Sequence, residues 1–219
     1  MQKDIMKNTV FTIGHSTHTI ADFMKWLNRY SIPLVCDVRS QPYSKYNSQF
    51  NKNSVQKALL GNGIEYLFLG EELGGRSKNT FCYDDKGRLQ YHLLAQEPLF
   101  KKGLEKIITE VEKRSIALMC SESAPLKCHR AILVCRQLYQ KLHFPKNNIQ
   151  HILSEGTLQT NAEMEKDLLD KFKIAPDMLR NEEECIAEAY NRQAQKIAYT
   201  YREEPALSDE SQLRDPPLF

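Results

Sequence analysis

The chain has 219 residues, of which 41% are hydrophobic, and 30 Lys and Arg against 28 Asp and Glu leave a net charge of +2. This predicts one domain with its own core plus appendages, and it gives no general indication of binding to nucleic acid or to an anionic membrane. No apolar run approaches the roughly 20 residues of a membrane span, and the N-terminus lacks the apolar region of a signal peptide. We therefore expect a cytoplasmic protein without a membrane partner.

Six cysteines are spread along the chain without a C-x-x-C pair. In a reducing compartment we expect them to be free thiols. Cys36 and Cys135 lie inside apolar runs, which is typical of small buried side chains.

Short apolar segments alternate with amphipathic ones along most of the chain. The apolar segments predict strands at 10–14, 32–36, 64–69, 115–119 and 148–153. Helical spacing and capping residues predict helices that begin at residue 20 and that span 55–60, 97–114 and 128–143. This alternation favours βαβ units with right-handed crossovers. We expect a flexible N-terminus at 1–8 and an α/β domain at 9–160. That domain would have an open, mostly parallel sheet of about five strands with helices on both faces.

The pattern becomes purely helical after residue 160. Two charged segments, 161–173 and 177–199, predict C-terminal helices in an extension at 161–201. These helices could pack on the core or mediate self-association, so a homo-oligomer is one expected partner. The segment 202–219 holds three prolines and many charges, which predicts a disordered tail.

The fourth predicted strand leads into the strongest indication of a functional site. The strand ends at a polar loop, and the loop runs into a helix start, which is where open α/β sheets place their ligand crevice. Free N–H groups at a helix start also favour anions. Five reactive or charged side chains lie in this short stretch: Cys120, Glu122, Cys128, His129 and Arg130.

Other predicted strands also end in polar side chains. His15 and Ser16 follow the first strand, Asp37 and Arg39 follow the second, and His151 and Glu155 lie near the end of the last. Because the carboxyl ends of parallel strands share one edge of the sheet, we expect these groups to line one crevice.

Two kinds of catalysis are open to these residues. Glu122 could be a nucleophile or general base, with Asp37 as a second carboxylate for glycosidic cleavage or His129 as acid/base partner. Cys128 or Cys120 could instead be a thiolate nucleophile or a sulfur carrier. The competing interpretations are an ion pair that holds the loop and inert thiols.

A phosphatase-type loop is disfavoured. Such a loop needs an Arg at the sixth position after its Cys, whereas the sixth residue after Cys120 is Leu126 and Arg130 is the tenth. Glu122 within the loop would also repel a phosphate.

Basic and aromatic residues nearby predict an anionic, aromatic ligand such as a nucleotide or nucleic acid. Arg39 and Arg130 suit phosphate or carboxylate groups, with structural ion pairs as the alternative. The loop after Arg39 could stack a base, or its aromatic rings could pack the loop down. Gly74 and Gly75 would let the backbone approach a ligand closely. The remaining candidates for substrate binding are Tyr43, Ser44, Tyr46, Phe50 and Arg76.

A zinc set of Cys120, Cys128, His129 and the distant His15 is a further alternative. The C-x7-C-H spacing matches no common ligand pattern, so no cofactor is predicted and zinc remains the lesser alternative.

Four motifs, taken in order, resemble the bacterial domain-of-unknown-function family 488. They are Ile13-Gly14-His15-Ser16; Asp37-Val38-Arg39 with Pro42 and Ser44; Leu69-Gly70 with Leu73-Gly74-Gly75-Arg76; and Cys120-Ser121-Glu122 with Cys128-His129-Arg130. The resemblance covers about residues 9–156 and implies a single α/β domain in an intracellular bacterial or archaeal setting. It implies no settled activity, and it strengthens the motif residues as candidates without assigning them roles.

The sequence thus favours an enzyme that hydrolyses or transfers a glycosidic or phosphoester bond of a nucleotide or nucleic-acid component. Cysteine-dependent sulfur or thiol chemistry is one alternative. The other is a non-catalytic module that binds a nucleotide or nucleic acid.

Overall fold

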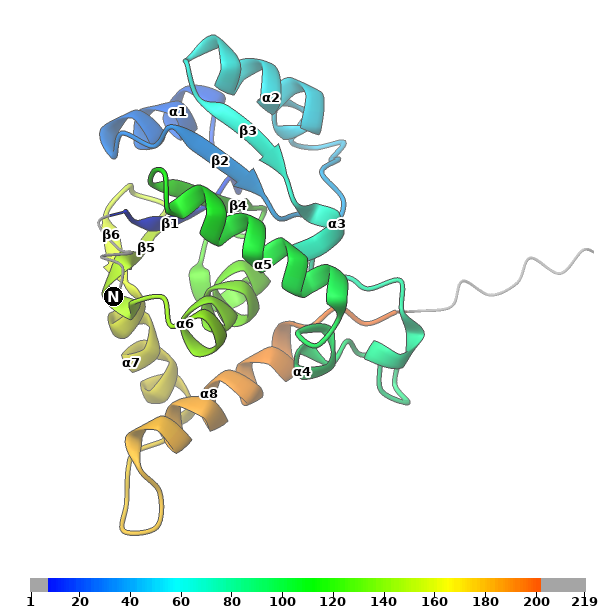
Figure 1. Ribbon diagram of the computed structural model, residues 1–219, viewed down its shortest axis with the longest axis vertical. Helices are drawn as coiled ribbons and strands as arrows, with labels where there is room; N and C mark the ends of the chain where they lie inside the picture. Colours follow the sequence, from blue (N-terminus) through cyan, green and yellow to red (C-terminus); the bar gives the residue numbers. More distant parts are fainter. Residues whose placement is uncertain (1–7, 202–219) are drawn as a thin grey trace, which may run out of the picture.

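The computed structural model describes residues 8–201, and its centre is an open six-stranded sheet with the strand order β3-β2-β4-β1-β5-β6 (Figure 1). The first five strands are parallel, and the sixth is antiparallel to β5. The expected α/β class and open, mostly parallel sheet are confirmed. The strands are β1 (Val10–Gly14), β2 (Leu34–Asp37), β3 (Glu65–Phe68), β4 (Ile116–Cys120), β5 (Ile149–Ile152) and β6 (Leu158–Thr160).

Helices connect the strands and cover both faces of the sheet. The helices are α1 (Ile20–Arg29), α2 (Lys52–Gly61), α3 (Gly70–Leu73), α4 (Tyr91–Leu94), α5 (Pro98–Val111), α6 (Arg136–Leu142), α7 (Asn161–Phe172) and α8 (Glu182–Ile197). A π-helical turn, η4 (Arg130–Cys135), leads directly into α6. Short 3-10 turns are η1 (Ser48–Phe50), η2 (Thr80–Cys82), η3 (Pro125–Lys127) and η5 (Lys146–Asn148).

The sheet separates two apolar cores. Phe23 and Leu27 of α1 pack with Val55 and Leu59 of α2 against one face. On the other face, α5, η4, α6, α7 and α8 share a larger core. Because both faces are covered, the central strands β1, β2 and β4 are fully buried and mostly apolar, which is why they were visible in the sequence.

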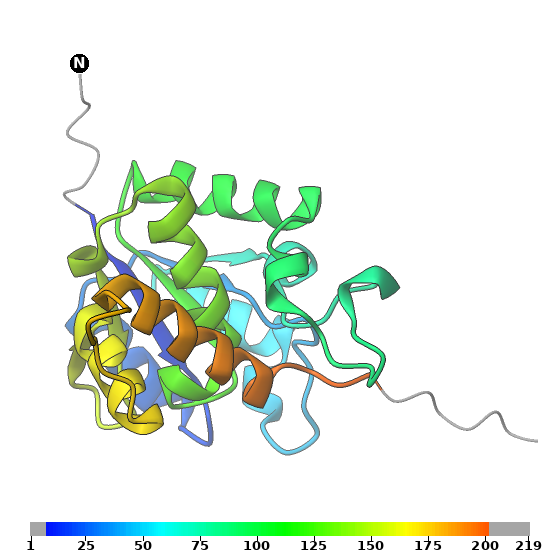
Figure 2. The ribbon, with the colours of Figure 1, turned by 90° about the horizontal axis from the view of Figure 1, so that it is seen from below.

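The C-terminal helices belong to the larger core. Cys185, Ala189 and Tyr190 of α8 are fully buried, and both views place α8 beside the helix formed by η4 and α6 (Figures 1 and 2). Capping boxes begin α7 at Thr160 and α8 at Asn181. The extension thus packs on the core, which was one of its two predicted roles, while self-association stays a prediction.

Two sequence expectations fall largely outside the described residues, namely the flexible N-terminus at 1–8 and the disordered tail at 202–219. Between residues 8 and 201, no helix combines the length and apolar character needed to cross a membrane.

The carboxyl ends of β2, β4 and β1 are held side by side by main-chain hydrogen bonds that extend the sheet. His15 N–H donates to the Cys120 carbonyl at 2.9 Å, and Val38 N–H donates to the Met119 carbonyl at 3.1 Å. Three of the four strand ends that we expected to share one crevice therefore meet. The expectation is wrong for β5, because its His151 is buried and bonds to Thr12 at 2.9 Å within the sheet.

Candidate functional site

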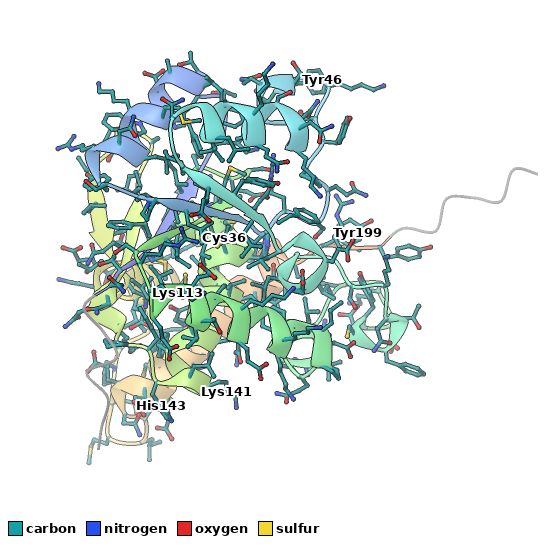
Figure 3. The ribbon with its side chains drawn as sticks, turned by 45° about the horizontal axis from the view of Figure 1, so that its top comes forward. Cys36, Tyr46, Lys113, Lys141, His143 and Tyr199 are labelled. Atoms are coloured by element: carbon teal, nitrogen blue, oxygen red, sulfur yellow. The ribbon has the colours of Figure 1, made fainter. Side chains whose placement is uncertain are left out.

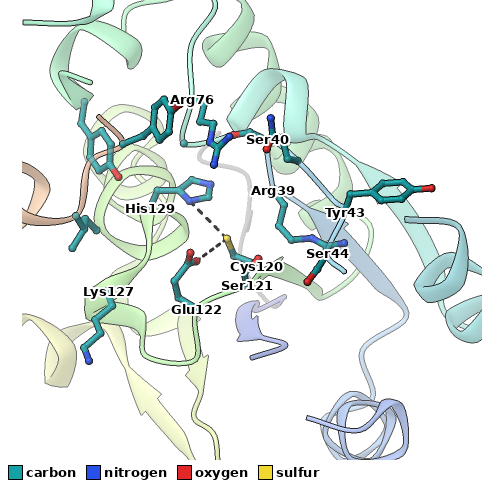
Figure 4. Close-up of a pocket in the computed structure, with 15 residues that line it drawn as sticks. Arg39, Ser40, Tyr43, Ser44, Arg76, Cys120, Ser121, Glu122, Lys127 and His129 are labelled. Carbon is teal, nitrogen blue, oxygen red and sulfur yellow. Dashed lines mark hydrogen bonds between the residues drawn. The ribbon is translucent and has the colours of Figure 1, made fainter. Parts of the chain in front are cut away.

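A cavity of about 430 Å³ lies at this edge of the sheet (Figure 4). It is bounded by the loops after β2 and β4, by the segment after α3 and by the end of α8. The sequence-predicted residues that line it are Arg39, Tyr43, Ser44, Gly75, Arg76, Cys120, Glu122 and His129.

Cys120, Glu122 and His129 form the centre of the cavity wall. The Cys120 thiol donates to Glu122 Oε2 at 3.1 Å, and its Sγ lies 3.7 Å from His129 Nδ1. Cys128 Sγ lies 4.0 Å from the same nitrogen, but Cys128 is only 1% exposed and does not line the cavity. Both sulfur atoms thus lie near the same imidazole nitrogen, Cys120 from the cavity wall and Cys128 from the buried side.

The orientation of His129 is fixed from two sides. Its Nε2 donates to the Val38 carbonyl at 3.0 Å, which leaves Nδ1 as an acceptor facing the sulfur atoms. Gly75 lies against the ring, since a Cβ there would come within 3.1 Å of the His129 Cγ. A larger residue at this position would therefore press on the imidazole and displace it slightly.

Interactions within the cluster lower the pKa of Cys128 and raise the pKa values of Cys120, Glu122 and His129. Burial favours the neutral Cys128 thiol, but hydrogen bonding from Cys120 and the charges of Arg130 and His129 set its pKa well below the usual value. The hydrogen bond to Cys128, together with burial, raises the pKa of Cys120. Burial lowers the pKa of His129, but the interaction with Cys128 outweighs it and raises the pKa overall. Burial and the charge of Cys128 raise the pKa of Glu122.

Asp37 and Arg39 form a closed pair behind the cavity. Asp37 is fully buried, its Oδ2 lies 2.6 Å from Arg39 Nη2, and it accepts the Tyr66 hydroxyl at 2.8 Å. Arg39 is 5% exposed and lines the cavity, whereas Asp37 does not. The structure therefore does not bring Asp37 together with Glu122 as two carboxylates facing one cavity.

His15 and Phe50 support this pair from the side of β1. His15 Nε2 lies 3.1 Å from Arg39 Nη1, and its ring stacks on Phe50 at 4.4 Å between centroids. Burial and the charge of Arg39 lower the pKa of His15 to about 4. Phe50 is fully buried, so it packs the loop down, which was the alternative to binding a base.

Arg130 is fully buried and holds the loop that follows β4. Its guanidinium donates to the carbonyl of Glu122 and, at 2.9 Å, to that of Ser123, and its Nε donates to Thr12. It is therefore a structural cation here, with no face open to the cavity.

The other predicted residues lie around the margin. Ser16, with φ of 44°, donates its N–H to the Ser121 carbonyl at 2.8 Å. Gly74 lines a neighbouring cavity of about 650 Å³, which shares Arg76 with the first. Tyr46 is 95% exposed at the outer edge of the molecule and does not line the first cavity (Figure 3).

Several lining residues were missed by sequence reasoning. Lys127 directly precedes Cys128, so its place in the motif loop was a usable signal. Tyr91 and Tyr199 come from segments without a motif. Tyr199, just after α8, lies under the Arg76 guanidinium at 4.3 Å from its ring centroid, and this contact between distant segments had no sequence signal.

Comparison with known proteins adds one relationship. Residues 19–136 match the family model described as Domain of unknown function DUF488, which is more than half of the chain. No curated protein and no solved structure matches.

Proposed function

The chain belongs to the DUF488 family, and from that premise we propose an enzyme that hydrolyses or transfers a glycosidic or phosphoester bond in a nucleotide or nucleic-acid component. The observation that carries the proposal is a carboxylate, Glu122, placed in a cavity whose other unpaired charged side chains, within the part of the chain that the structure describes, are cationic.

Arg76 and Lys127 supply this positive charge. Within residues 8–201 neither forms an ion pair, unlike Arg39, which is neutralised by Asp37. Unpaired cations in a concave site favour an anionic ligand, and an Arg guanidinium suits a phosphate. The charge distribution therefore supports a phosphate-bearing substrate.

Tyrosines provide surfaces for an aromatic group. Tyr43 is 76% exposed at the margin of the cavity, and Tyr199 is held by its contact with Arg76. Bases stack on such rings without strong sequence preference. A volume of about 430 Å³ also lies within the range of small-ligand sites. Phosphate and base recognition together favour a nucleotide.

Glu122 is the group best placed to activate water. It is hydrogen-bonded to Cys120 yet remains open to the cavity, whereas both nitrogens of His129 are engaged. Asp37 is sealed by Arg39 and Tyr66, so a mechanism with two carboxylates lacks its second group in the cavity. We therefore assign Glu122 as a general base that removes a proton from the attacking water or acceptor hydroxyl.

Thiol chemistry receives less support from the geometry. Cys128, whose pKa is lowered, is buried away from the cavity, and Cys120, which lines it, has a raised pKa. The thiolate and the substrate space are thus separated.

The test is product detection by liquid chromatography with mass spectrometry on a panel of nucleosides, nucleotides, NAD, short DNA and short RNA. We expect wild type to release a free base or a phosphate, which identifies the bond, and Glu122→Gln to lose about 10²-fold or more of that turnover. Glu155→Gln, an exposed glutamate outside the cavity, is the matched control and should keep full activity. Equal turnover by wild type and Glu122→Gln would refute the role of Glu122. Retention of a panel member without product would instead indicate a binding module.

A further inference from the structure

Four potential metal ligands gather around one point at the wall of the cavity. One donor atom from each of Cys120, Glu122, Cys128 and His129 lies within 4.8 Å of all the others. Figure 4 shows the cavity-lining members of this group, Cys120, Glu122 and His129, directed toward one another. The group is assembled from the end of β4, the loop that follows it and the start of the next helix.

The separations are close to those of a tetrahedral ion. Donors bonded to zinc at 2.0–2.3 Å in a tetrahedron are about 3.3–3.8 Å apart. The Cys120 and Cys128 sulfur atoms lie 3.7 Å and 4.0 Å from His129 Nδ1, and the two sulfur atoms lie within 4.8 Å of each other. Only small side-chain movements would bring these atoms onto one ion.

The ligand atoms of His129 and Cys128 are oriented by hydrogen bonds of the kind that support metal ligands. Zinc-bound imidazoles usually donate their second N–H to a carbonyl or carboxylate, and His129 Nε2 donates to the Val38 carbonyl at 3.0 Å. The Arg130 N–H lies 3.4 Å from Cys128 Sγ and donates to it. These contacts aim the imidazole lone pair and stabilise negative charge on the sulfur.

The donor set also selects the metal. Two thiolates and an imidazole are soft and intermediate ligands, which favour zinc over magnesium or calcium. The four side chains differ in their access to the cavity. Cys128 is buried away from it, whereas Cys120, Glu122 and His129 line it. An ion among them would therefore have one side toward the substrate space.

We propose that Cys120, Cys128 and His129 bind one zinc ion, with a fourth coordination position that faces the cavity beside Glu122. Binding displaces the protons of the two thiols into solvent, and a water fills the fourth position. Three protein ligands with one open position are typical of catalytic zinc sites, in which the metal polarises water. This inference rests on the proposed function, since it supplies the water from which Glu122 takes a proton.

The first experiment is metal analysis of the full-length protein by inductively coupled plasma mass spectrometry. We expect one zinc per chain in wild type and in Cys135→Ala, a matched control that removes a buried cysteine from η4, the turn that follows His129. Cys120→Ala, Cys128→Ala and His129→Asn should each lose the metal. Zinc retained by Cys128→Ala at the wild-type level, or no metal bound by wild type after incubation with zinc and a thiol-free reductant, would overturn the proposal.

A second measurement does not depend on any variant folding. Replacing the ion in wild type with Co²⁺ should give an intense near-ultraviolet band of thiolate-to-cobalt charge transfer and visible bands of a tetrahedral ion. A cobalt spectrum without the thiolate band would refute ligation by the cysteines.

Glu122→Gln separates the failure of the zinc site from the failure of the proposed function. It should keep the zinc and lose turnover; loss of the zinc would show that Glu122 closes the coordination shell, against the open position proposed. Full zinc with no turnover of any panel member would leave the metal site standing and refute the function. Full turnover by protein from which the zinc has been removed would leave the function standing and refute the role of the ion in supplying the water.

Discussion

The Arg130 guanidinium donates a hydrogen bond to the main-chain carbonyl of Glu122, eight residues earlier in the chain. A fully buried cation thus fixes the backbone of Glu122, the carboxylate that faces the cavity among residues 8–201. The contact uses the forked geometry of arginine, because neighbouring nitrogens reach the carbonyls of Glu122 and Ser123 together.

Arg130→Lys should therefore destabilise the fold although it keeps the charge. A lysine cannot reach both carbonyls, and each buried carbonyl left without a donor costs about 1–3 kcal/mol. We expect a loss of about 2–4 kcal/mol in the free energy of unfolding, measured by urea titration. Arg192→Lys, on the exposed face of α8, is the control, with an expected change below about 0.5 kcal/mol. Equal stability of Arg130→Lys and wild type would contradict this account of the loop.

Gly14→Ala tests the packing of the same loop from the side of β1. A Cβ at Gly14 would lie 1.8 Å from the Glu122 carbonyl oxygen, so the loop or the strand must shift. We expect a cost of about 1–3 kcal/mol in thermal or urea unfolding together with loss of turnover. Gly61→Ala meets no atom within 4 Å and should leave both unchanged. Full activity in Gly14→Ala would show that the position of Glu122 is not critical.

Arg76→Ala should weaken substrate binding more than it slows the chemical step. Removing one charge-assisted contact to an anionic ligand costs about 1.5–3 kcal/mol, so KM should rise about 10-fold to 100-fold while kcat changes little. Steady-state kinetics at low and high salt would measure this, and the effect should shrink at high salt. Arg29→Ala, on the outer side of α1, is the charge-matched control. A fall in kcat with unchanged KM would place Arg76 in the chemistry instead.

His151 should make the fold sensitive to acid. Burial, with the nearby charge of Arg130, lowers its pKa to about 3 in the folded protein, whereas an unfolded chain has a value of about 6.5. Between these values the unfolded state binds the extra proton, so stability falls as pH falls, by up to about 1.4 kcal/mol per pH unit. Urea unfolding at pH 7 and pH 5 should show this loss in wild type and a smaller one in His151→Asn. His92→Asn, which alters an exposed histidine, should retain the wild-type dependence; an unchanged dependence in His151→Asn would exclude His151 as its source.

Local patterns predicted the fold because the sheet is buried on both sides. The apolar run at 116–119 and the polar residues after it identified both β4, which the structure extends to Cys120, and the loop that carries Glu122. β6 was missed because it is three residues long, has an exposed residue and pairs at an edge. Such a strand carries no apolar run to detect.

The roles of the arginines were harder to predict for a physical reason. A guanidinium that binds phosphate and one that binds a buried partner have the same sequence signature. Arg39 forms an ion pair with Asp37, two residues earlier, and the Arg130 guanidinium donates its hydrogen bonds to main-chain carbonyls. Only the packing distinguishes them from Arg76, whose guanidinium reaches the cavity and lies over Tyr199.

The contact between Arg76 and Tyr199 also sets when the site is completed during synthesis. β1, β2 and β4, with the Cys120 and Glu122 loop, are all made within the first 122 residues. The wall that holds Arg76 waits for Tyr199, after α8 has emerged and docked. A nascent chain therefore carries Cys120, Glu122, Cys128 and His129 well before it carries Tyr199, so the wall around Arg76 is completed later in synthesis than the cluster itself.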